Sequence, residues 1–259
     1  MKIALMDSGI GLLPAAAALR ELRPDADLVI SCDPEGMPWG PRTPADLTEH
    51  ALACARAAAE YRPDALVVAC NTATVHALDA LRAELEPGIP VIGTVPAIKP
   101  AARAGGRVAI WATPATTGSA YQRGLIAEFG GGAEITEVPC PGLADAVEHA
   151  DEEALERAIA AAAALTPAGV GTVVLGCTHY ELVAERIRAA VAPPAGTDLV
   201  LLGSADAVAA QTLRRAAPEA LARTGSGTLT VLLTGRPGEL PAPAARYPQG
   251  RVLTAAPVA

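Results

Sequence analysis

The sequence predicts an α/β fold that is built from a repeated unit. Short apolar, β-branched runs alternate with amphipathic helical patterns along most of the 259 residues, and this alternation is typical of parallel sheets covered by helices. The strand that ends at Asp7 has a counterpart that ends at Ala112, and Cys70 has a counterpart at Cys177. Because the two pairs have nearly equal separations, a duplicated α/β unit with a boundary near residues 95–99 is favoured over two unrelated βαβ segments.

The elements are expected in the following order. Strands are predicted at residues 3–6, 26–31, 65–69, 91–93, 107–111, 133–138, 171–175, 199–202 and 228–233. Helices are predicted at 12–22, 44–59, 74–85, 119–129, 152–165 and 205–216, with a turn or helix at 99–103. Thr43-Pro44 is a helix start signal, because threonine caps a helix and proline suits its first turn. The Pro- and Ala-rich segment 236–245 is expected to wrap over the surface, and the elements after residue 204 are expected to return to the first domain.

Composition and charge exclude several classes of partner. The net charge is −8 and the chain has no cluster of Lys and Arg, so nucleic acid or an anionic membrane is not expected as a partner. The first seven residues form a strand pattern that ends in an acid and not a signal peptide. The long uncharged run at residues 158–180 is interrupted by Thr166-Pro167-Ala168-Gly169, so no membrane span is expected. A cytoplasmic protein is therefore predicted.

The five cysteines are expected to be free thiols, because the cytoplasm is reducing. None of them is spaced as CxxC, which argues against zinc. Cys32, Cys54 and Cys140 are interpreted as packing residues. The histidines His50, His76 and His149 are likewise interpreted as structural or solvent-facing.

A glycine-rich turn follows the first strand, with the sequence Asp7-Ser8-Gly9-Ile10-Gly11. It lacks the third glycine of a dinucleotide fingerprint, because Pro14 stands at that position. The turn is expected to present the Asp7 carboxylate and the Ser8 hydroxyl to a crevice. The alternative is that Asp7 only caps the following helix.

Two cysteines stand where predicted strands give way to helical patterns, and polar residues follow each of them. Cys70 precedes Asn71-Thr72, and Cys177 precedes Thr178-His179. A lone cysteine at such a place is often buried filler, but the start of a helix stabilises a thiolate and binds carboxylates. Two such thiols suit a reaction that moves a proton from one face of a carbon atom to the other, since one group takes the proton and the other gives one.

Together these motifs resemble a known family. The motifs are Asp7-Ser8-Gly9-Ile10-Gly11, Pro38-Trp39-Gly40, Ala69-Cys70-Asn71-Thr72-Ala73, Pro90-Val91-Ile92-Gly93, Ala112-Thr113 with Thr116, and Gly176-Cys177-Thr178-His179-Tyr180. In this order they resemble the glutamate racemases of the cofactor-independent aspartate/glutamate racemase superfamily. The resemblance extends from the first strand to about Ala209.

The resemblance implies two pseudo-symmetric three-layer α/β domains, each with a mainly parallel sheet, and an active site in the interdomain cleft. The first domain would comprise residues 1–97 plus 205–259, and the second residues 98–204. The implied reaction is racemisation of L-glutamate to D-glutamate for peptidoglycan synthesis, with no pyridoxal phosphate, metal or nucleotide as cofactor. A homodimer is compatible with this reading.

The resemblance also assigns roles to residues. Cys70 would exchange the α-proton with the D-enantiomer and Cys177 with the L-enantiomer. Asp7 would lie beside Cys70, and His179 with Glu148 beside Cys177. The residues implied to bind the substrate are Asp7, Ser8, Trp39, Gly40, Asn71, Thr72, Thr113, Thr116, Thr178 and His179.

Alternatives to this function remain open on the sequence. Trp39 stands where the family usually has tyrosine, which leaves aspartate or another acidic amino acid as an alternative substrate. A cysteine hydrolase would use Cys177 and His179 and leave Cys70 idle. A binding domain on the same fold would use neither thiol for chemistry.

Overall fold

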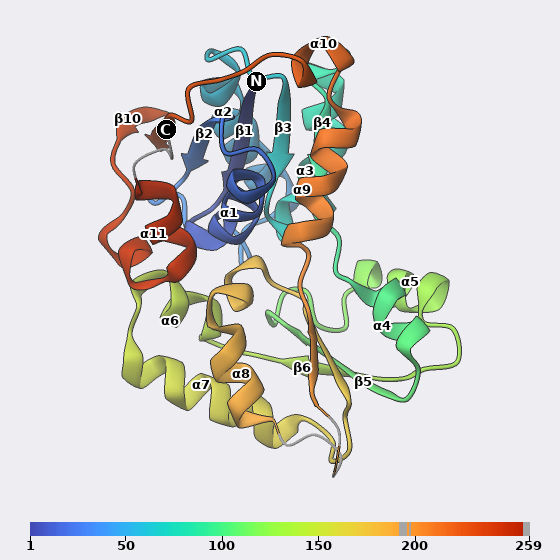
Figure 1. Cartoon of the computed structure of the whole chain (residues 1–259). Coiled ribbons are helices and arrows are strands. Elements are labelled where there is room, and N and C mark those ends of the chain that lie inside the picture. Colours follow the sequence, from blue (N-terminus) through green and yellow to red (C-terminus); the bar gives the residue numbers. More distant parts are fainter. Residues whose placement is uncertain (192–195, 197, 256–259) are drawn as a thin grey trace. The chain divides into compact units, whose positions relative to one another are not determined.

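A computed structural model describes residues 1–191, 196 and 198–255 (Figure 1). The contacts within the chain divide it into two compact units, Met1–Val95 with Ala205–Ala259 and Pro96–Ser204. The last four residues of the predicted first domain lie outside the described part of the chain.

The first unit contains a six-stranded sheet in the order β10-β9-β2-β1-β3-β4. All neighbouring strands are parallel except β9 and β10. The strands are β1 (Lys2–Asp7), β2 (Asp27–Cys32), β3 (Ala65–Val68), β4 (Val91–Gly93), β9 (Leu229–Leu233) and β10 (Arg236–Gly238). Because β9 pairs with β2, the chain returns to this sheet after it has formed the second unit.

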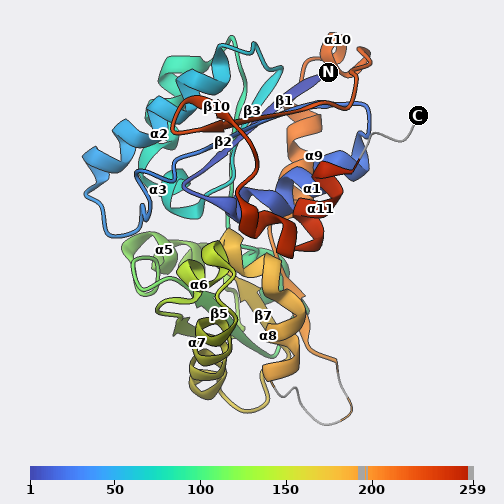
Figure 2. The ribbon, with the colours of Figure 1, turned by 90° about the vertical axis from the view of Figure 1, so that its left-hand side faces the viewer.

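Helices cover both faces of this sheet, so the first unit has three layers (Figure 2). α2 (Pro44–Ala59) and α3 (Asn71–Leu85) pack together on one face, and α1 (Leu13–Leu22) packs with α9 (Ala205–Arg215) and α11 (Pro248–Thr254) on the other. The remaining short elements are η1 (Ile10–Leu12), α10 (Pro218–Leu221) and η3 (Ala242–Arg246). Alternate residues of the strands face the two helical layers, since side chains point to opposite faces of a strand in turn.

The second unit contains a parallel four-stranded sheet in the order β6-β5-β7-β8. Its strands are β5 (Arg107–Ala112), β6 (Glu134–Pro139), β7 (Thr172–Leu175) and β8 (Val200–Leu202). Its helices are α4 (Ile98–Ala104), α5 (Ala120–Phe129), α6 (Leu143–His149), η2 (Thr178–Val183), α7 (Glu152–Leu165) and α8 (Ala184–Ala190). One core cluster packs Val108, Ile110 and Val174 of the sheet against α4 and α5. On the other face, Trp111 Nε1 donates to Thr166 Oγ1 directly after α7, at 2.9 Å.

The strand order confirms the predicted fold class. In each unit the second strand, the first, the third and the fourth lie side by side in that order, as β2-β1-β3-β4 and as β6-β5-β7-β8. Both units are therefore α/β layers with a mainly parallel sheet, and the duplication that the nearly equal separations suggested is visible in their topology.

Local capping explains where three helices begin. Thr43 accepts a hydrogen bond from Asp46 N at α2, and Ser119 accepts one from Gln122 N at α5. Asp151 accepts one from Ala154 N at α7. In each case a side-chain oxygen satisfies a backbone N–H that has no partner within the helix.

The structure corrects the sequence prediction at several elements. The segment 236–245 is more than a surface wrap, because β10 forms a hairpin with β9 and η3 follows it. Thr234 and Gly235 both have positive φ, at 46° and 76°, which suits a two-residue hairpin turn. The helix predicted from residue 74 begins at Asn71. The short helices α6, α8, α10 and α11 were not predicted, since helices of four to seven residues are too short to show a helical periodicity.

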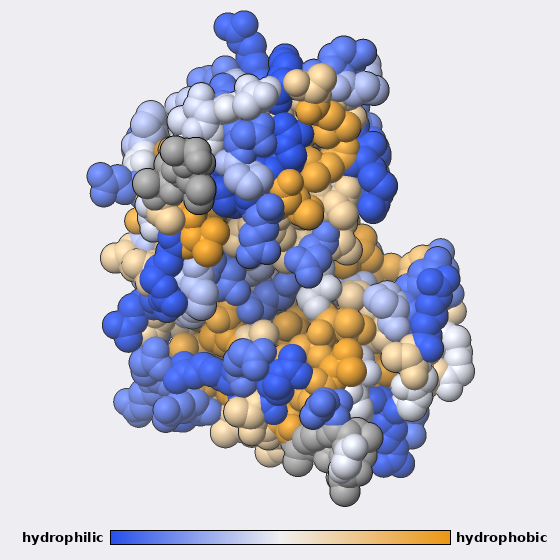
Figure 3. All heavy atoms as spheres, viewed as in Figure 1, coloured by the Kyte–Doolittle hydropathy of each residue, from blue (hydrophilic) through white to orange (hydrophobic). Residues whose placement is uncertain are grey.

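The exposed large hydrophobic side chains of the described residues come from six separate segments. They are Leu22, Val95, Leu165, Val200, Leu221 and Val252. On the face shown in Figure 3, hydrophobic and hydrophilic residues are interspersed. Single exposed apolar residues are normal on a folded protein. Within the described part of the chain, no helix has both the length and the apolar character of a membrane span.

The central strand β1 should contribute strongly to stability, because it lies between two helical layers and its Leu5 side chain is fully buried. We expect Leu5→Ala to lower the free energy of unfolding by about 2–5 kcal/mol, since it leaves a cavity in a packed core. Leu22→Ala is the matched control, because Leu22 is 51% exposed, and it should change the free energy by less than about 0.5 kcal/mol. Urea denaturation followed by circular dichroism measures both. Equal losses for the two variants would contradict the burial of Leu5.

Candidate active site

In the first unit, Asp7 and Cys70 lie at the carboxyl ends of neighbouring strands. Asp7 is the last residue of β1, and Cys70 follows β3 after one residue. Met6 pairs with Val68 in the sheet, and Ala69 N donates to Met6 O at 2.9 Å. The two polar residues therefore emerge at the same edge of the sheet, where parallel α/β sheets commonly bind ligands.

The Asp7 carboxylate is fully buried and holds the glycine-rich turn. Its Oδ1 accepts from Ser8 N at 2.7 Å and from Ser8 Oγ at 3.3 Å. The turn then enters η1 and α1, with Pro14 in the first turn of α1. The N-cap residues of the two helices that follow are Gly9 for η1 and Leu12 for α1, so Asp7 is the N-cap of neither.

Cys70 is the residue that precedes the first turn of α3. It is buried, has extended backbone angles, and its carbonyl accepts from Thr74 N at 2.9 Å. Asn71 is buried and Thr72 is half-buried in that first turn. Thr94 fixes the strand end from the far side, because its Oγ1 donates to Val68 O at 2.9 Å. The Cys70 thiol therefore lies at the positively polarised end of a helix, held by a well-bonded turn.

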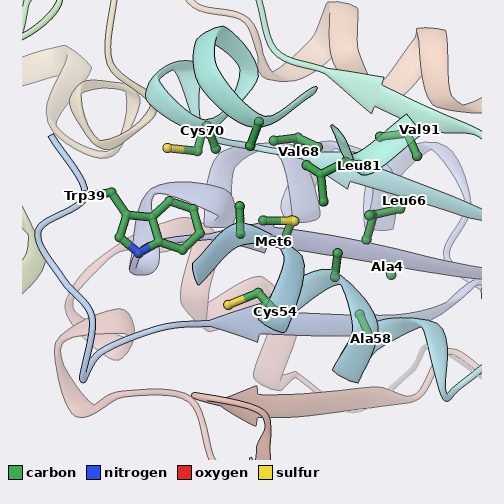
Figure 4. Close-up of a cluster of buried hydrophobic side chains, with 14 of the residues drawn as sticks. Ala4, Met6, Trp39, Cys54, Ala58, Leu66, Val68, Cys70, Leu81 and Val91 are labelled. Carbon is green, nitrogen blue, oxygen red and sulfur yellow. The ribbon is translucent and has the colours of Figure 1, made fainter. Parts of the chain in front are cut away.

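The segment with Trp39 and Gly40 connects β2 to α2. The Trp39 ring is buried in the same cluster as Cys70 and Met6, and Figure 4 shows the Cys70 sulfur directed away from Val68 and Leu81. Trp39 Nε1 donates to Asp33 Oδ2 at 3.0 Å, so its one polar atom is used within the protein. Gly40 is half-buried.

In the second unit, Gly176 allows β7 to approach β5 closely just before Cys177. Gly176 N donates to Trp111 O at 2.7 Å, and a Cβ at Gly176 would lie 2.8 Å from the same oxygen. A larger residue would push the two strand ends apart. Cys177 follows in an extended conformation and is partly exposed, and η2 begins directly after it.

Cys177, His179 and Glu148 form a line of side chains within the second unit. His179 Nδ1 lies 3.9 Å from Cys177 Sγ, and His179 Nε2 lies 2.9 Å from Glu148 Oε2. Both His179 and Glu148 are more than 90% buried. Because an ionised carboxylate only accepts hydrogen bonds, Nε2 carries a proton and Nδ1 faces the thiol. The imidazole is thereby oriented to exchange a proton with the sulfur.

Further hydroxyl groups and a tyrosine surround the end of this sheet. Thr113 Oγ1 donates to Thr116 Oγ1 at 3.2 Å in the turn after β5, and Thr178 is buried next to Cys177. Tyr180 is fully buried and donates to Cys140 O at 3.4 Å. Burial raises the pKa of Tyr180 well above its ordinary value, so this hydroxyl stays protonated.

The structure thus gathers the expected residues in two groups, one in each unit. The first holds Asp7, Ser8, Trp39, Gly40, Cys70, Asn71 and Thr72, and the second holds Thr113, Thr116, Glu148, Cys177, Thr178 and His179. Sequence reasoning missed Asp33, although a charged residue directly after an apolar strand was the same signal that drew attention to Asp7. Among the described residues, no three His, Cys, Asp or Glu side chains are grouped as metal ligands.

Two of the other cysteines should be unreactive. Burial, together with the charges of Asp33 and Asp7, raises the pKa of Cys54 to about 12. Burial also raises the pKa of Cys140 to about 12, with a contribution from Cys177. At about pH 8 both are therefore thiols, which are poor nucleophiles.

We expect brief treatment of the native protein with iodoacetamide at about pH 8 to modify Cys177 first, because it is partly exposed. Cys54 and Cys140 should react only after denaturation. Peptide mass spectrometry measures the extent of modification at each site. Modification of Cys54 at the rate of Cys177 would contradict the burial that this structure shows.

The chain is similar to known racemases over most of its length. The sequence profile of the Asp/Glu/hydantoin racemase family matches residues 14–212. A glutamate racemase of Roseiflexus sp. is 37% identical over 243 residues, which cover 91% of this chain and 88% of the relative. A glutamate racemase of Herpetosiphon aurantiacus is 36% identical, with 91% and 93% covered.

A solved structure is similar as well. The glutamate racemase of Escherichia coli, solved in complex with L-glutamate and the activator UDP-MurNAc-Ala, has a TM-score of 0.79 and 30% sequence identity. The similarity covers 95% of this chain and 91% of that protein. Sequence and fold thus agree, and the three relatives named above are all glutamate racemases. The chain therefore belongs to the Asp/Glu/hydantoin racemase family.

Proposed function

We propose that this protein interconverts L-glutamate and D-glutamate by a two-thiol proton transfer. The observation that carries the proposal is the repeated placement of a cysteine two residues after the third strand of each unit, Cys70 after β3 and Cys177 after β7. Racemisation requires one group that removes the α-proton and a second group that delivers a proton to the opposite face. A duplicated fold supplies two such groups in equivalent positions.

In the proposed reaction, Cys70 acts on the D-enantiomer and Cys177 on the L-enantiomer. The Cys70 thiolate takes the α-proton of D-glutamate while the Cys177 thiol gives its own proton to the other face, and the roles reverse for L-glutamate. Asp7 assists the first thiol and His179, oriented by Glu148, assists the second. The mechanism requires the substrate complex to bring both sulfur atoms to opposite faces of one α-carbon.

The acidity of the α-carbon is the main obstacle, because its proton is far less acidic than a thiol with a pKa of about 8.5. Most of that gap must be closed by removing water and by donors placed around the developing negative charge. The first turn of α3 offers backbone N–H groups together with Asn71 and Thr72, and the second unit offers Thr178 and the pair Thr113 and Thr116. We propose these groups as the ligands of the amine and the two carboxylates.

Proton NMR in deuterated water tests the function. We expect the α-proton signal of L-glutamate to disappear in the presence of the purified protein, with parallel loss of optical rotation. L-aspartate, tested separately, should react more slowly. Exchange with aspartate and not with glutamate would retain the mechanism and change the substrate, and absence of exchange with both would reject the racemase proposal.

The line from Cys177 through His179 to Glu148 also favours a second candidate. A nucleophile, a base and a group that orients the base are the elements of a cysteine hydrolase. In that case Cys70 would have no role, so Cys70→Ala would retain turnover. A racemase should lose racemisation in this variant, which separates the two candidates.

The cellular setting is proposed with the reaction. We propose that the enzyme acts in the cytoplasm on a small acidic amino acid and supplies D-glutamate for peptidoglycan. Growth of a D-glutamate-requiring bacterium on medium without D-glutamate, after expression of this chain, tests the supply. No growth, with active protein present in the cells, would contradict it.

A further inference from the structure

A buried carboxylate lies directly after β2 in the first unit. Asp33 is 1% exposed, and its Oδ2 accepts from Trp39 Nε1 at 3.0 Å and lies 2.7 Å from His50 Nδ1. Its Oδ1 accepts from Gly36 N and from Thr234 Oγ1, each at 3.2 Å. A buried charge is tolerated only when such partners replace its water. Asp33 therefore fixes the start of the segment that carries Trp39 and Gly40.

Two residues of α2, His50 and Asp46, form a ring of polar contacts with this segment. His50 contacts Asp33 through Nδ1, and its Nε2 lies 3.7 Å from Asp46 Oδ1. Asp46 also accepts from Arg42 Nη1 at 2.7 Å, and Arg42 Nε donates to Gly36 O at 2.6 Å. These contacts connect Asp33, at the start of the segment, through His50 and Asp46 to Arg42, at its end. The backbone between Asp33 and Arg42 is therefore held at both ends.

Gly36 shows how tightly this ring encloses the segment. A Cβ at Gly36 would lie 1.9 Å from Asp33 Oδ2 and 2.5 Å from His50 Nδ1. Any side chain at this position would separate the carboxylate from the imidazole. The sequence therefore provides a glycine where the Asp33–His50 contact requires one.

The same carboxylate connects the segment to the candidate site. Asp33 N donates to Ser8 O at 3.1 Å, which joins it to the glycine-rich turn. The Trp39 ring that Asp33 holds packs in the cluster that includes Cys70 and Met6 (Figure 4). His50 itself is one turn before Cys54 on α2 and is partly exposed. Its contact with Asp33 links it to Trp39 and so to the candidate site.

We propose that His50 is a positioning residue for substrate binding, which acts by holding Asp33 and, through it, Trp39 and the backbone at Gly40. The inference rests on the proposed function. Because Trp39 Nε1 is occupied by Asp33, the indole does not supply a hydrogen bond to the substrate, and recognition at this segment falls to the backbone of Gly40. Loss of the His50 contact should loosen the segment and weaken binding, with the thiol chemistry itself left intact.

The kinetic test compares His50→Ala with His50→Asn. Asparagine keeps an N–H donor near the place of Nδ1, whereas alanine removes it. We expect His50→Ala to raise KM about tenfold with kcat within about threefold of wild type, because a misplaced binding segment weakens positioning. His50→Asn should restore most of the KM. His76→Ala is the matched control, since His76 is an exposed histidine on the neighbouring helix α3, and it should leave KM unchanged.

A second measurement follows Trp39 without any turnover. The chain has two tryptophans, and Trp111→Phe leaves Trp39 as the single tryptophan, whose fluorescence is excited selectively over that of the tyrosines. In that background we expect acrylamide to quench Trp39 weakly, more strongly after His50→Ala, and weakly again after His50→Asn. Quenching measures the exposure of Trp39 to solvent without turnover, so it applies even if the protein does not racemise glutamate.

The outcomes separate the two proposals. An unchanged KM in His50→Ala, or equal KM increases in the alanine and asparagine variants, would overturn the positioning role. Unchanged quenching in His50→Ala would overturn the structural link itself. Inactive wild-type protein with the expected quenching pattern would reject the racemase function and retain the link between His50 and Trp39.

Discussion

Racemisation of glutamate is expected to fall by about 10³-fold or more when either Cys70 or Cys177 is replaced by alanine, because each thiol is one of two essential proton carriers. The two losses should be alike, although the cysteines differ in burial: Cys70 is buried and Cys177 is partly exposed. Polarimetry with each enantiomer measures the loss.

The two single variants should differ in the exchange that they retain. Cys177→Ala keeps the Cys70 thiol, which can remove the α-proton of D-glutamate and return a deuteron to the same face. Cys70→Ala should do the same with L-glutamate only. Proton NMR in deuterated water, run separately on the two enantiomers, distinguishes these cases, because exchange then occurs without inversion.

Cys54→Ala is the matched control for these variants, since Cys54 is a buried thiol of the first unit that the proposed reaction does not use. It should retain racemisation. Retained racemisation in Cys70→Ala would contradict the two-thiol mechanism, because the proposed reaction needs a proton carrier on each face of the α-carbon. Exchange of both enantiomers by one single variant would contradict the assignment of one face to each thiol.

The strand ends and their cysteines could be predicted from sequence because both depend on local patterns. A buried strand is recognised in the sequence as an apolar run, and the residue that follows the strand lies at the edge of the sheet where the strand ends. Asp7, Cys70 and Cys177 all follow from this rule. The strand order within each unit was not predicted, because it depends on which segments pair across the sheet and not on a local pattern.

The sequence did not predict that the element after Cys70 differs from the element after Cys177. A 15-residue helix follows Cys70, whereas the six-residue 3-10 helix η2 follows Cys177. In the second unit, Glu181 Oε1 accepts from Ser204 N at 2.7 Å and from Ser204 Oγ at 2.9 Å. This contact ties η2 to the segment after β8, and a sequence pattern does not reveal such tertiary contacts.

The Asp33 network was missed for a related reason. Its members are Trp39, His50 and Thr234, and the last of these is 201 residues away in the chain. In the sequence alone, each member has an ordinary interpretation: Trp39 as a loop residue, His50 as a helix residue and Thr234 as a turn residue. Only their convergence on one buried carboxylate distinguishes them.

The second large effect is expected at His179. Its imidazole is the group next to Cys177, at 3.9 Å, and it is buried against Glu148. We expect His179→Ala to lower kcat about 100-fold, because a positioned acid or base contributes on the order of 10²–10⁴ to proton transfer. Glu148→Gln should lower kcat less, by about tenfold, since it keeps the imidazole and removes only the charge that orients it.

Comparing the effect of His179→Ala on the two enantiomers identifies which of the two proton transfers the imidazole assists. The equilibrium constant between mirror-image substrates is one, so kcat/KM must fall equally in both directions. The rates of deuterium exchange at the α-carbon, by contrast, can differ between the two enantiomers. In His179→Ala, exchange of the L-glutamate α-proton by Cys177 should slow far more than exchange of the D-glutamate α-proton by Cys70.

His149→Ala provides the control for this experiment, since His149 is an exposed histidine directly after Glu148. It should leave both exchange rates within about twofold of wild type, as expected for a surface substitution. Equal slowing of exchange for both enantiomers in His179→Ala would indicate a role in substrate binding and not in proton transfer at Cys177. Selective slowing for L-glutamate would place the imidazole on the Cys177 side, where the line from sulfur to carboxylate lies within the second unit.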